Sequence, residues 1–174
     1  MTQKQYLRRI AILCLHCLRN LAYYRAGWSK GSLILRSNFW VAVNGNFIDI
    51  CVLEWCKLFG DSKGKHFWKK RISDSEAFLS GLLNKLGMNE EEFNNYITEM
   101  RTYRDKYIAH WDLDEKVTVP RLDITKKSAL YLYTYLLDHE DKGGYFDDGP
   151  RNASQFYDVA LKEGKAIFET LTSK

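Results

Sequence analysis

The chain has 174 residues, of which 45% are hydrophobic and 14% aromatic, so it can bury the core of a single domain spanning residues 1–174. Its formal net charge of +4 is compatible with a nucleic-acid partner but is too small to require one. Arg8, Arg9 and Arg19 interrupt the N-terminal apolar stretch, which argues against a secretion signal. We also expect no segment with the roughly 18 to 20 uncharged apolar residues of a membrane span, and therefore a soluble, cytoplasmic protein without a membrane contact.

Two long helices are predicted at the start of the chain, which contains only two prolines. The first is expected over about residues 3–24, and the GWSKG stretch at residues 27–31 ends it. The second is expected over about residues 32–59. Its apolar residues mark two faces, with Phe39, Val43, Ile50 and Leu53 on one and Trp40, Phe47, Cys51, Trp55 and Leu58 on the other. A helix that is apolar on most sides is typical of the centre of a bundle.

Four further helices are predicted in the rest of the chain. They are expected over about residues 75–86, from Asn89 onward, over about residues 124–141 and over about residues 152–172. The helix that follows Asn89 begins with a capping box, because Glu92 stands three residues after the asparagine. No strand pair is predicted. The predicted fold class is an all-α, up-and-down antiparallel helical bundle with an additional short helix.

The stretch YRDKYIAHWD, residues 103–112, ends the helix that contains the capping box. On a helical wheel of about 100° per residue, Arg104 lies inside the apolar stripe and His110 on its flank. A guanidinium cannot lose its charge, so a buried arginine needs a carboxylate, a phosphate or water. Three explanations remain open. Arg104 could pair with an inward carboxylate such as Asp49 or Glu54, reach the surface along its apolar stem, or face a cleft or partner subunit where an anion binds. The histidine is equally compatible with a structural role, since an imidazolium is favoured near a helix C-terminus.

The segment RDKYIAHWD resembles the signature of the HEPN superfamily, in which an arginine and a polar residue precede a histidine by a few positions. Asp105 is the polar residue here, and five residues separate Arg104 from His110. The YIAH sequence followed by an acidic residue is similar to the abortive-infection branch of that superfamily. The recognisable pattern covers about ten residues, whereas the resemblance in fold covers about residues 1–172.

The resemblance implies a metal-independent ribonuclease without a cofactor, in phage defence or a toxin–antitoxin pair. HEPN domains commonly form homodimers, with both motifs along a shared cleft. By this analogy, Arg104 would contact the scissile phosphate of RNA, His110 would act as general acid or base, and Asp105 would orient one of them. A cognate antitoxin or a nucleotidyltransferase-type partner is also implied. One toxin subgroup carries a tyrosine that such a partner modifies, but this chain has Asp112 in that place, which argues against this form of regulation.

The same resemblance also allows a catalytically inactive binding or assembly module, because many superfamily members have lost activity. In an α-helix, six residues rise about 9 Å, and side chains at that spacing diverge by about 120°. One helix therefore cannot easily direct both Arg104 and His110 at one phosphate. A catalytic site would need a second copy of the chain across a two-fold axis, or a kink near the histidine.

A basic connector at residues 60–72 offers a second candidate RNA contact. The residues concerned are Lys65, Lys69, Lys70, Arg71 and Trp68. The cations could meet phosphates while the tryptophan stacks on a base. The alternative is a solvated loop that is held in place by its aromatic side chains.

The four cysteines are predicted to pack in the core. Cys14 and Cys17 form a CxxC pair, but they and Cys51 and Cys56 lie on apolar helix faces, and the second pair lacks the spacing of a zinc site. We therefore expect no metal site in this chain.

Overall fold

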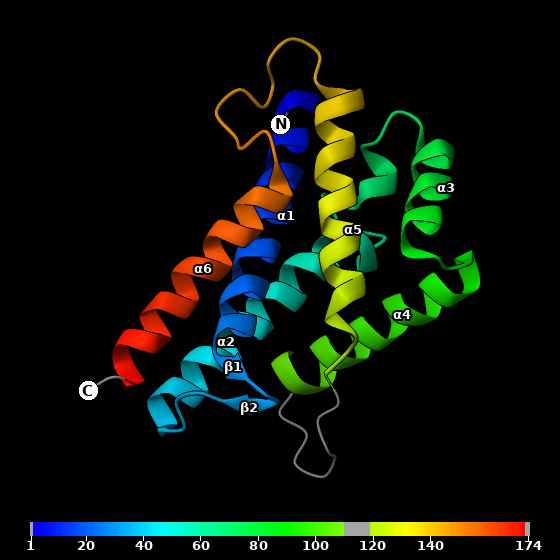
Figure 1. The fold of residues 1–174 in the computed structure, drawn as a ribbon. Coiled ribbons are helices and arrows are strands. Elements are labelled where there is room, and N and C mark those ends of the chain that lie inside the picture. The colour runs from blue at the N-terminus through cyan, green and yellow to red at the C-terminus, as the bar shows by residue number, and fades with distance from the viewer. Residues whose placement is uncertain (1, 110–118, 173–174) are drawn as a thin grey trace.

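The computed structural model describes residues 2–109 and 119–172, which form helices with almost no strand (Figure 1). This confirms the predicted all-α fold class. The described ranges contain six α-helices: α1 (Gln3–Ala26), α2 (Asn38–Trp55), α3 (Ser75–Leu86), α4 (Glu90–Tyr103), α5 (Leu122–Tyr135) and α6 (Ala153–Thr172). In Figure 1, α3 lies beside α5, while α4 crosses the lower end of α5 at a steep angle instead of running parallel to it.

Helix α1 is the central helix, and it packs against α2, α5 and α6. Its buried side chains cover more than half of the helix circumference; they include Leu7, Ile10, Leu13, Cys14, Cys17, Leu18 and Leu21. The prediction that the second helix is central was wrong. Helix α2 buries one face, which carries Ile48, Cys51 and Trp55, whereas Phe39 and Ile50 on the other face are 66% and 40% exposed.

Three of the helices end in a π-helical turn. These turns are Cys56–Gly60 after α2, Arg104–Ala109 after α4 and Leu136–Glu140 after α5. A π-helical turn is wider than an α-helical one and is often found at functional sites. The start of α4 agrees with the predicted capping box: the Asn89 amide donates to Glu92 Oε2 (2.8 Å), and the Glu92 amide donates to Asn89 Oδ1 (2.9 Å).

A short antiparallel hairpin separates α1 from α2, where no strand pair was predicted. Its strands are β1 (Trp28–Ser29) and β2 (Ser32–Leu33). The two turn residues, Lys30 and Gly31, have φ angles of 49° and 76°, the left-handed pair that joins tightly twisted strands. The GWSKG stretch therefore ends α1 as predicted. It also forms a turn that delays the start of the next helix to Asn38.

Asn44 ties α2 to this hairpin and to the end of α1. Its side chain is buried, its Nδ2 donates to the carbonyl of Tyr24 (3.0 Å), and its Oδ1 accepts from Trp28 Nε1 (3.0 Å). A Cβ atom at Gly27 would lie 2.3 Å from Asn44 Nδ2, so the glycine allows the amide to approach the backbone. The amide thus fixes where α2 leaves the hairpin.

The core is one cluster of buried residues centred on aromatic contacts of Trp55. Its ring stacks on Phe59 and meets Tyr96 edge-on, at centroid distances of 5.0 and 5.3 Å. Its Nε1 donates to Ser128 Oγ (2.8 Å), so the one polar atom of the indole is paired. The four cysteines are fully buried in the same cluster, which confirms their predicted packing role. Burial raises the pKa of the Cys56 thiol to about 12.

By length and composition alone, the segment Asn38–Gly60 is apolar enough to cross a membrane. It contains Asp49, Glu54 and Lys57, so it is not an uncharged stretch of the kind that the sequence analysis did not expect. It consists of α2 and the π-helical turn that follows it, 23 residues in all, and an 18-residue window within it has a mean hydropathy of 1.2. The core helix of a soluble protein passes the same test. Here 33% of that window is buried.

Replacing Asn44 with alanine should lower the free energy of unfolding by about 1–3 kcal/mol, because the Tyr24 carbonyl and the Trp28 indole N–H lose their buried partner. Urea denaturation followed by circular dichroism measures the change. Asn94→Ala, at an exposed position on α4, is the matched control. Equal stability of the two variants would show that the amide does not anchor α2.

Candidate functional site

Arg104 is the first residue of the π-helical turn at the end of α4, and its side chain is 18% exposed. Two carboxylates hold the guanidinium. Nη1 donates to Asp61 Oδ1 (2.5 Å), and Nε donates to Asp105 Oδ1 (2.8 Å). The carboxylates belong to different parts of the chain, so the pair of bonds joins the end of α4 to the segment that follows α2.

Local structure brings Asp61 to this position. It directly follows the π-helical turn of α2, and its amide donates to the carbonyl of Cys56 (2.8 Å). Its own carbonyl accepts from the Gly64 amide (2.7 Å), which closes a tight turn. A Cβ at Gly60 would lie 3.2 Å from Arg101 Cγ, so this glycine allows α4 to pass close to the end of α2. The carboxylate is therefore supplied by a fixed turn.

These contacts bear on two of the three explanations for Arg104. It pairs with carboxylates, but with Asp61 and Asp105 instead of the predicted Asp49 or Glu54. Glu54 bonds to Lys57 at 3.0 Å. The side chain also extends toward the surface, because Asp61 is 36% and Asp105 54% exposed. Arg104 thus combines the internal ion pair with the apolar stem that reaches water.

The electrostatics of this cluster favour a permanently charged guanidinium. The two aspartates hold the pKa of Arg104 above its ordinary value, and the hydrogen bond to Asp105 is the largest cause. One guanidinium and two carboxylates carry a formal charge of −1 together. An incoming phosphate must therefore compete with a carboxylate or approach Nη2, the guanidinium nitrogen that these two bonds do not use.

Asp49 lies near Tyr103 of α4, because its charge contributes to the raised pKa of that tyrosine. Burial raises the pKa of its carboxyl group above the ordinary value. Burial also raises the pKa of Tyr103 to about 12, with a contribution from the charge of Asp49. The Tyr103 ring lies 5.4 Å from that of Tyr107 in the π-helical turn. The environment around this end of α4 is therefore apolar enough to disfavour ionised tyrosine and aspartate.

His110 and Asp112 lie outside the described residues, so the distance between the histidine and Arg104 is not part of the geometry above. Of the three predicted catalytic residues, the structure brings Arg104 and Asp105 together. Asp61 is the residue that the sequence analysis missed. Its only sequence signal is its place in the GDSKG turn directly after a long apolar helix.

The basic connector has the character of a loop held by its aromatic residues. The Trp68 ring is only 4% exposed and packs on Phe78 at 4.6 Å, so it is not placed to stack on a base. The Arg71 guanidinium lies 3.6 Å from the centroid of the Tyr6 ring. Arg71 Nε donates to the carbonyl of Lys65. These contacts fold the connector onto α1.

Lys65, Lys69 and Lys70 are exposed on the connector, and they are its remaining predicted RNA contacts. Lys70 Nζ lies 3.5 Å from the carbonyl of Gly64. The Arg104 guanidinium is held by two carboxylates, whereas these lysines are exposed to solvent.

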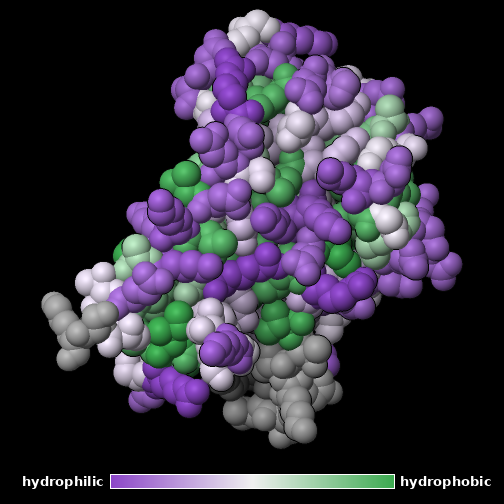
Figure 2. Space-filling model, viewed as in Figure 1, coloured by the Kyte–Doolittle hydropathy of each residue, from purple (hydrophilic) through white to green (hydrophobic). Residues whose placement is uncertain are grey.

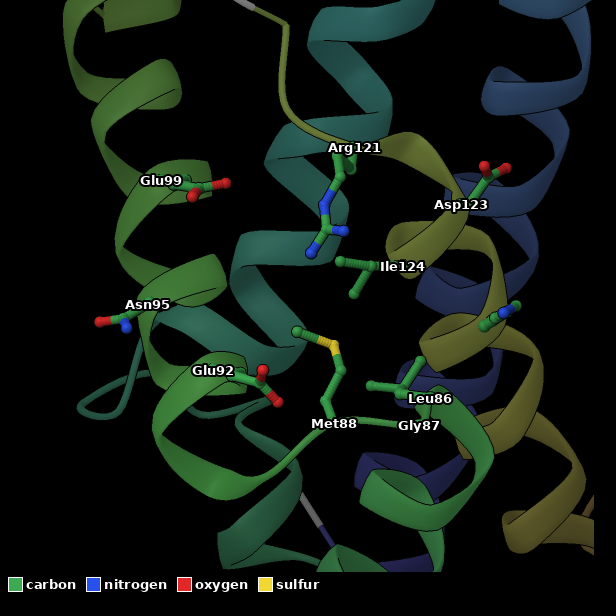
Figure 3. A pocket seen from close by; sticks show the side chains of 10 residues that line it. Leu86, Gly87, Met88, Glu92, Asn95, Glu99, Arg121, Asp123 and Ile124 are labelled. Atoms are coloured by element: carbon green, nitrogen blue, oxygen red, sulfur yellow. The ribbon is translucent and has the colours of Figure 1, made fainter.

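A pocket of about 620 Å³ lies between the α3–α4 junction and the start of α5 (Figure 3). Arg121 and Met88 point into it, and Glu92 lines its edge. The glutamate is already engaged by the capping box of α4. None of the predicted site residues lines this pocket, and its mixture of opposite charges does not define one kind of ligand.

Comparison with known proteins does not assign a family: no family model matches the sequence, and neither the curated proteins nor the solved structures give a match. Within residues 2–109 and 119–172, no group of three or more histidine, cysteine, aspartate or glutamate side chains is placed to hold a metal ion. The candidate site therefore rests on the Arg104 cluster and the motif that contains it.

Arg104→Ala should lower the free energy of unfolding by only about 1 kcal/mol, because Asp61 and Asp105 remain partly in water when their partner is lost. Thermal and urea unfolding would measure the change. Arg101→Ala, one turn earlier on α4, is the matched control. A loss of more than about 3 kcal/mol would show instead that Arg104 neutralises a fully buried charge.

Proposed function

We propose that the protein is a HEPN-type metal-independent endoribonuclease that acts in phage defence or a toxin–antitoxin system, with a site shared by two copies of the chain. The observation that carries the proposal is the placement of Arg104. This arginine of the RDKYIAH motif stands at the start of a widened turn, near the surface, and is held in one orientation by two carboxylates. The guanidinium is thus charged, oriented and close to the surface, as an arginine that binds a phosphate must be.

In the proposed reaction, the ribose 2′-hydroxyl attacks the adjacent phosphorus while the bond to the 5′-oxygen of the next nucleotide breaks. Arg104 stabilises the negative charge that builds on the phosphate oxygens. His110 takes the proton of the 2′-hydroxyl or supplies one to the leaving 5′-oxygen. Asp105 orients the arginine through its bond to Nε, which leaves Nη2 to address the phosphate.

The π-helical turn bears on the geometry of the proposed site. In an α-helix, residues three and four apart share a face, but in a π-helical turn the hydrogen bonds join residues five apart. The segment Arg104–Ala109 follows the second pattern. The α-helical wheel therefore does not give the direction of a side chain after Ala109. The two routes to a complete site remain a second copy of the chain and a change of direction at this turn.

A second candidate function is a catalytically inactive binding or assembly module. The formal charge of −1 on the Arg104 cluster favours this second candidate, because the guanidinium already bonds to two carboxylates, Asp61 and Asp105. In this case Arg104 joins α4 to the end of α2, and the chain binds its partner elsewhere. RNA cleavage separates the two candidates.

The purified protein should cleave a labelled single-stranded RNA in excess EDTA. Arg104→Ala and His110→Ala should each slow cleavage at least about 100-fold, since they remove the charge stabilisation and the proton transfer. Arg101→Ala, on the same helix and outside the motif, should change the rate by no more than about twofold. Gel analysis of the labelled products gives the rates, and circular dichroism confirms that each variant is folded.

Cleavage that persists in both motif variants would reject the proposed site. If the wild-type protein binds RNA or a protein partner but yields no cleavage products, the second candidate function is supported instead. Products that end in a 2′,3′-cyclic phosphate would support attack by the 2′-hydroxyl.

A further inference from the structure

A second pocket, of about 260 Å³, lies between the outer face of α1, the start of α6 and the loop of residues 141–152. We call it the α1 slot. In Figure 1 this loop arches over the N-terminal end of α1, and α6 begins directly after it. Figure 2 shows a largely hydrophilic surface at that end of the molecule, with hydrophobic patches between the polar residues. The slot is separate from the Arg104 cluster, because none of the residues of that cluster lines it.

Helix α1 provides the floor of the slot through the side chains of Arg8, Ile12, Leu15 and Arg19. These residues follow one another at steps of four, three and four positions, which places them along one face of the helix. The floor therefore has an arginine at each end and an apolar middle. Ile12 in this middle part is 40% exposed, so the apolar floor is open to a ligand.

Aromatic side chains form the walls of the slot, and they are Tyr133, Tyr145, Phe146 and Phe156. The first three belong to the core cluster or pack against it. Phe156 and Ile12 are absent from the core cluster and from the described residues that pack against it, so both face the slot without serving the core. An apolar and aromatic lining with a few placed polar groups is the usual form of a small-molecule site.

Hydrogen bonds hold the roof of the slot, which is the loop of residues 141–152. The Tyr145 amide donates to Asp141 Oδ1 (2.6 Å), which closes a turn within the loop. Tyr133 Oη donates to the carbonyl of Pro150 (2.8 Å), which ties the loop to α5. The slot is therefore preformed, and a ligand does not have to order the loop when it binds.

The two arginines of the floor have different partners. Arg8 Nη1 donates to the carbonyl of Tyr145 (2.9 Å), and Nη2 pairs with the carboxylate of Asp148. The Arg19 guanidinium instead lies 5.2 Å from the centroid of the Phe156 ring, and its side chain forms no hydrogen bond or ion pair with a described residue. The lining side chains carry a formal charge of +1, and the uncompensated charge is at the Arg19 end.

We propose that the α1 slot binds a small aromatic carboxylate, with the ring against the apolar lining and the carboxylate on the Arg19 guanidinium. The fork of a guanidinium matches the two oxygens of a carboxylate, and a monoanion matches the formal charge of the lining. Aromatic walls favour a ring, which packs against them edge-on or offset. A volume of about 260 Å³ is just below the range of about 300–1,000 Å³ for drug-sized ligands, so one ring with a short acid side chain fits.

The inference is independent of the ribonuclease proposal, because it concerns a different ligand at a different place. A nucleic-acid strand is not favoured in the slot. Such a strand is bound through several cations, whereas Arg19 is the one cation among the lining residues that has no carboxylate partner.

The probe for the test is 3-phenylpropionate, and NMR of the backbone amides measures its binding to the full chain. Saturable shifts are expected in α1 and in residues 141–152, with a Kd of about 1 mM or lower for a ligand of about 11 non-hydrogen atoms. Arg19→Gln should weaken binding at least about tenfold, because the charged partner of the carboxylate is lost. Arg36→Gln, at an exposed arginine outside the slot, is the matched control and should change the Kd by no more than about twofold.

Two further probes separate the charge of the ligand from its ring. The neutral 3-phenylpropanamide should bind the wild-type protein at least about tenfold more weakly than the acid, and Arg19→Gln should bind the two compounds equally. Hexanoate, which has the charge but no ring, should also bind more weakly than the aromatic acid.

The absence of saturable shifts up to about 10 mM probe overturns the inference, as does an equal effect of the Arg19 and Arg36 substitutions. An amide that binds as tightly as the acid rejects the role of Arg19, and hexanoate that binds as tightly rejects the aromatic ligand. RNA cleavage is measured separately. A protein that cleaves RNA but does not bind the probe rejects only this inference, and the reverse result rejects only the ribonuclease proposal.

Discussion

The charge of Arg104 is the constraint that joins the end of α4 to the turn after α2. A guanidinium cannot shed its proton, so a side chain that is 18% exposed must be given anionic partners or water. The chain meets this requirement with one neighbouring carboxylate, Asp105, and one from the turn after α2, Asp61. Two helix ends that are far apart in the sequence are thereby joined at one point. Two further features allow α4 to pass close to the end of α2. Gly60 has no side chain, and the π-helical turn after α2 places the Asp61 carboxylate within hydrogen-bonding distance of Arg104.

Most of the fold could be predicted because apolar periodicity reports which residues are buried. α1, α3 and α6 begin and end close to their predicted positions, α4 begins where predicted, and the capping box at Asn89 and Glu92 forms as expected. The π-helical turns could not be predicted, because the local sequence of a helix end does not specify whether its last hydrogen bonds join residues four or five apart. The hairpin at Lys30 and Gly31 was missed because two-residue strands carry no periodicity.

The position of α2 was predicted wrongly for a physical reason. Both of its faces are apolar, and apolarity does not distinguish a face buried by the same chain from one that awaits a partner. The central place belongs to α1, whose buried residues are interrupted by the exposed Lys4, Arg9 and Arg19. The site shows the same limit. The sequence indicates that Arg104 needs a carboxylate, but Asp61 lies in a turn whose direction depends on tertiary packing, so the nearer helical candidates Asp49 and Glu54 were preferred.

Different parts of α2 have different structural roles. Its inner face completes the core through Trp55, its end positions Asp61 for Arg104, and its outer face leaves Phe39 and Ile50 exposed. The π-helical turn Arg104–Ala109 packs against this same helix. The ion pair between Asp61 and Arg104 therefore ties the turn that carries the motif to the helix that completes the core, so the position of the motif depends on how α2 packs.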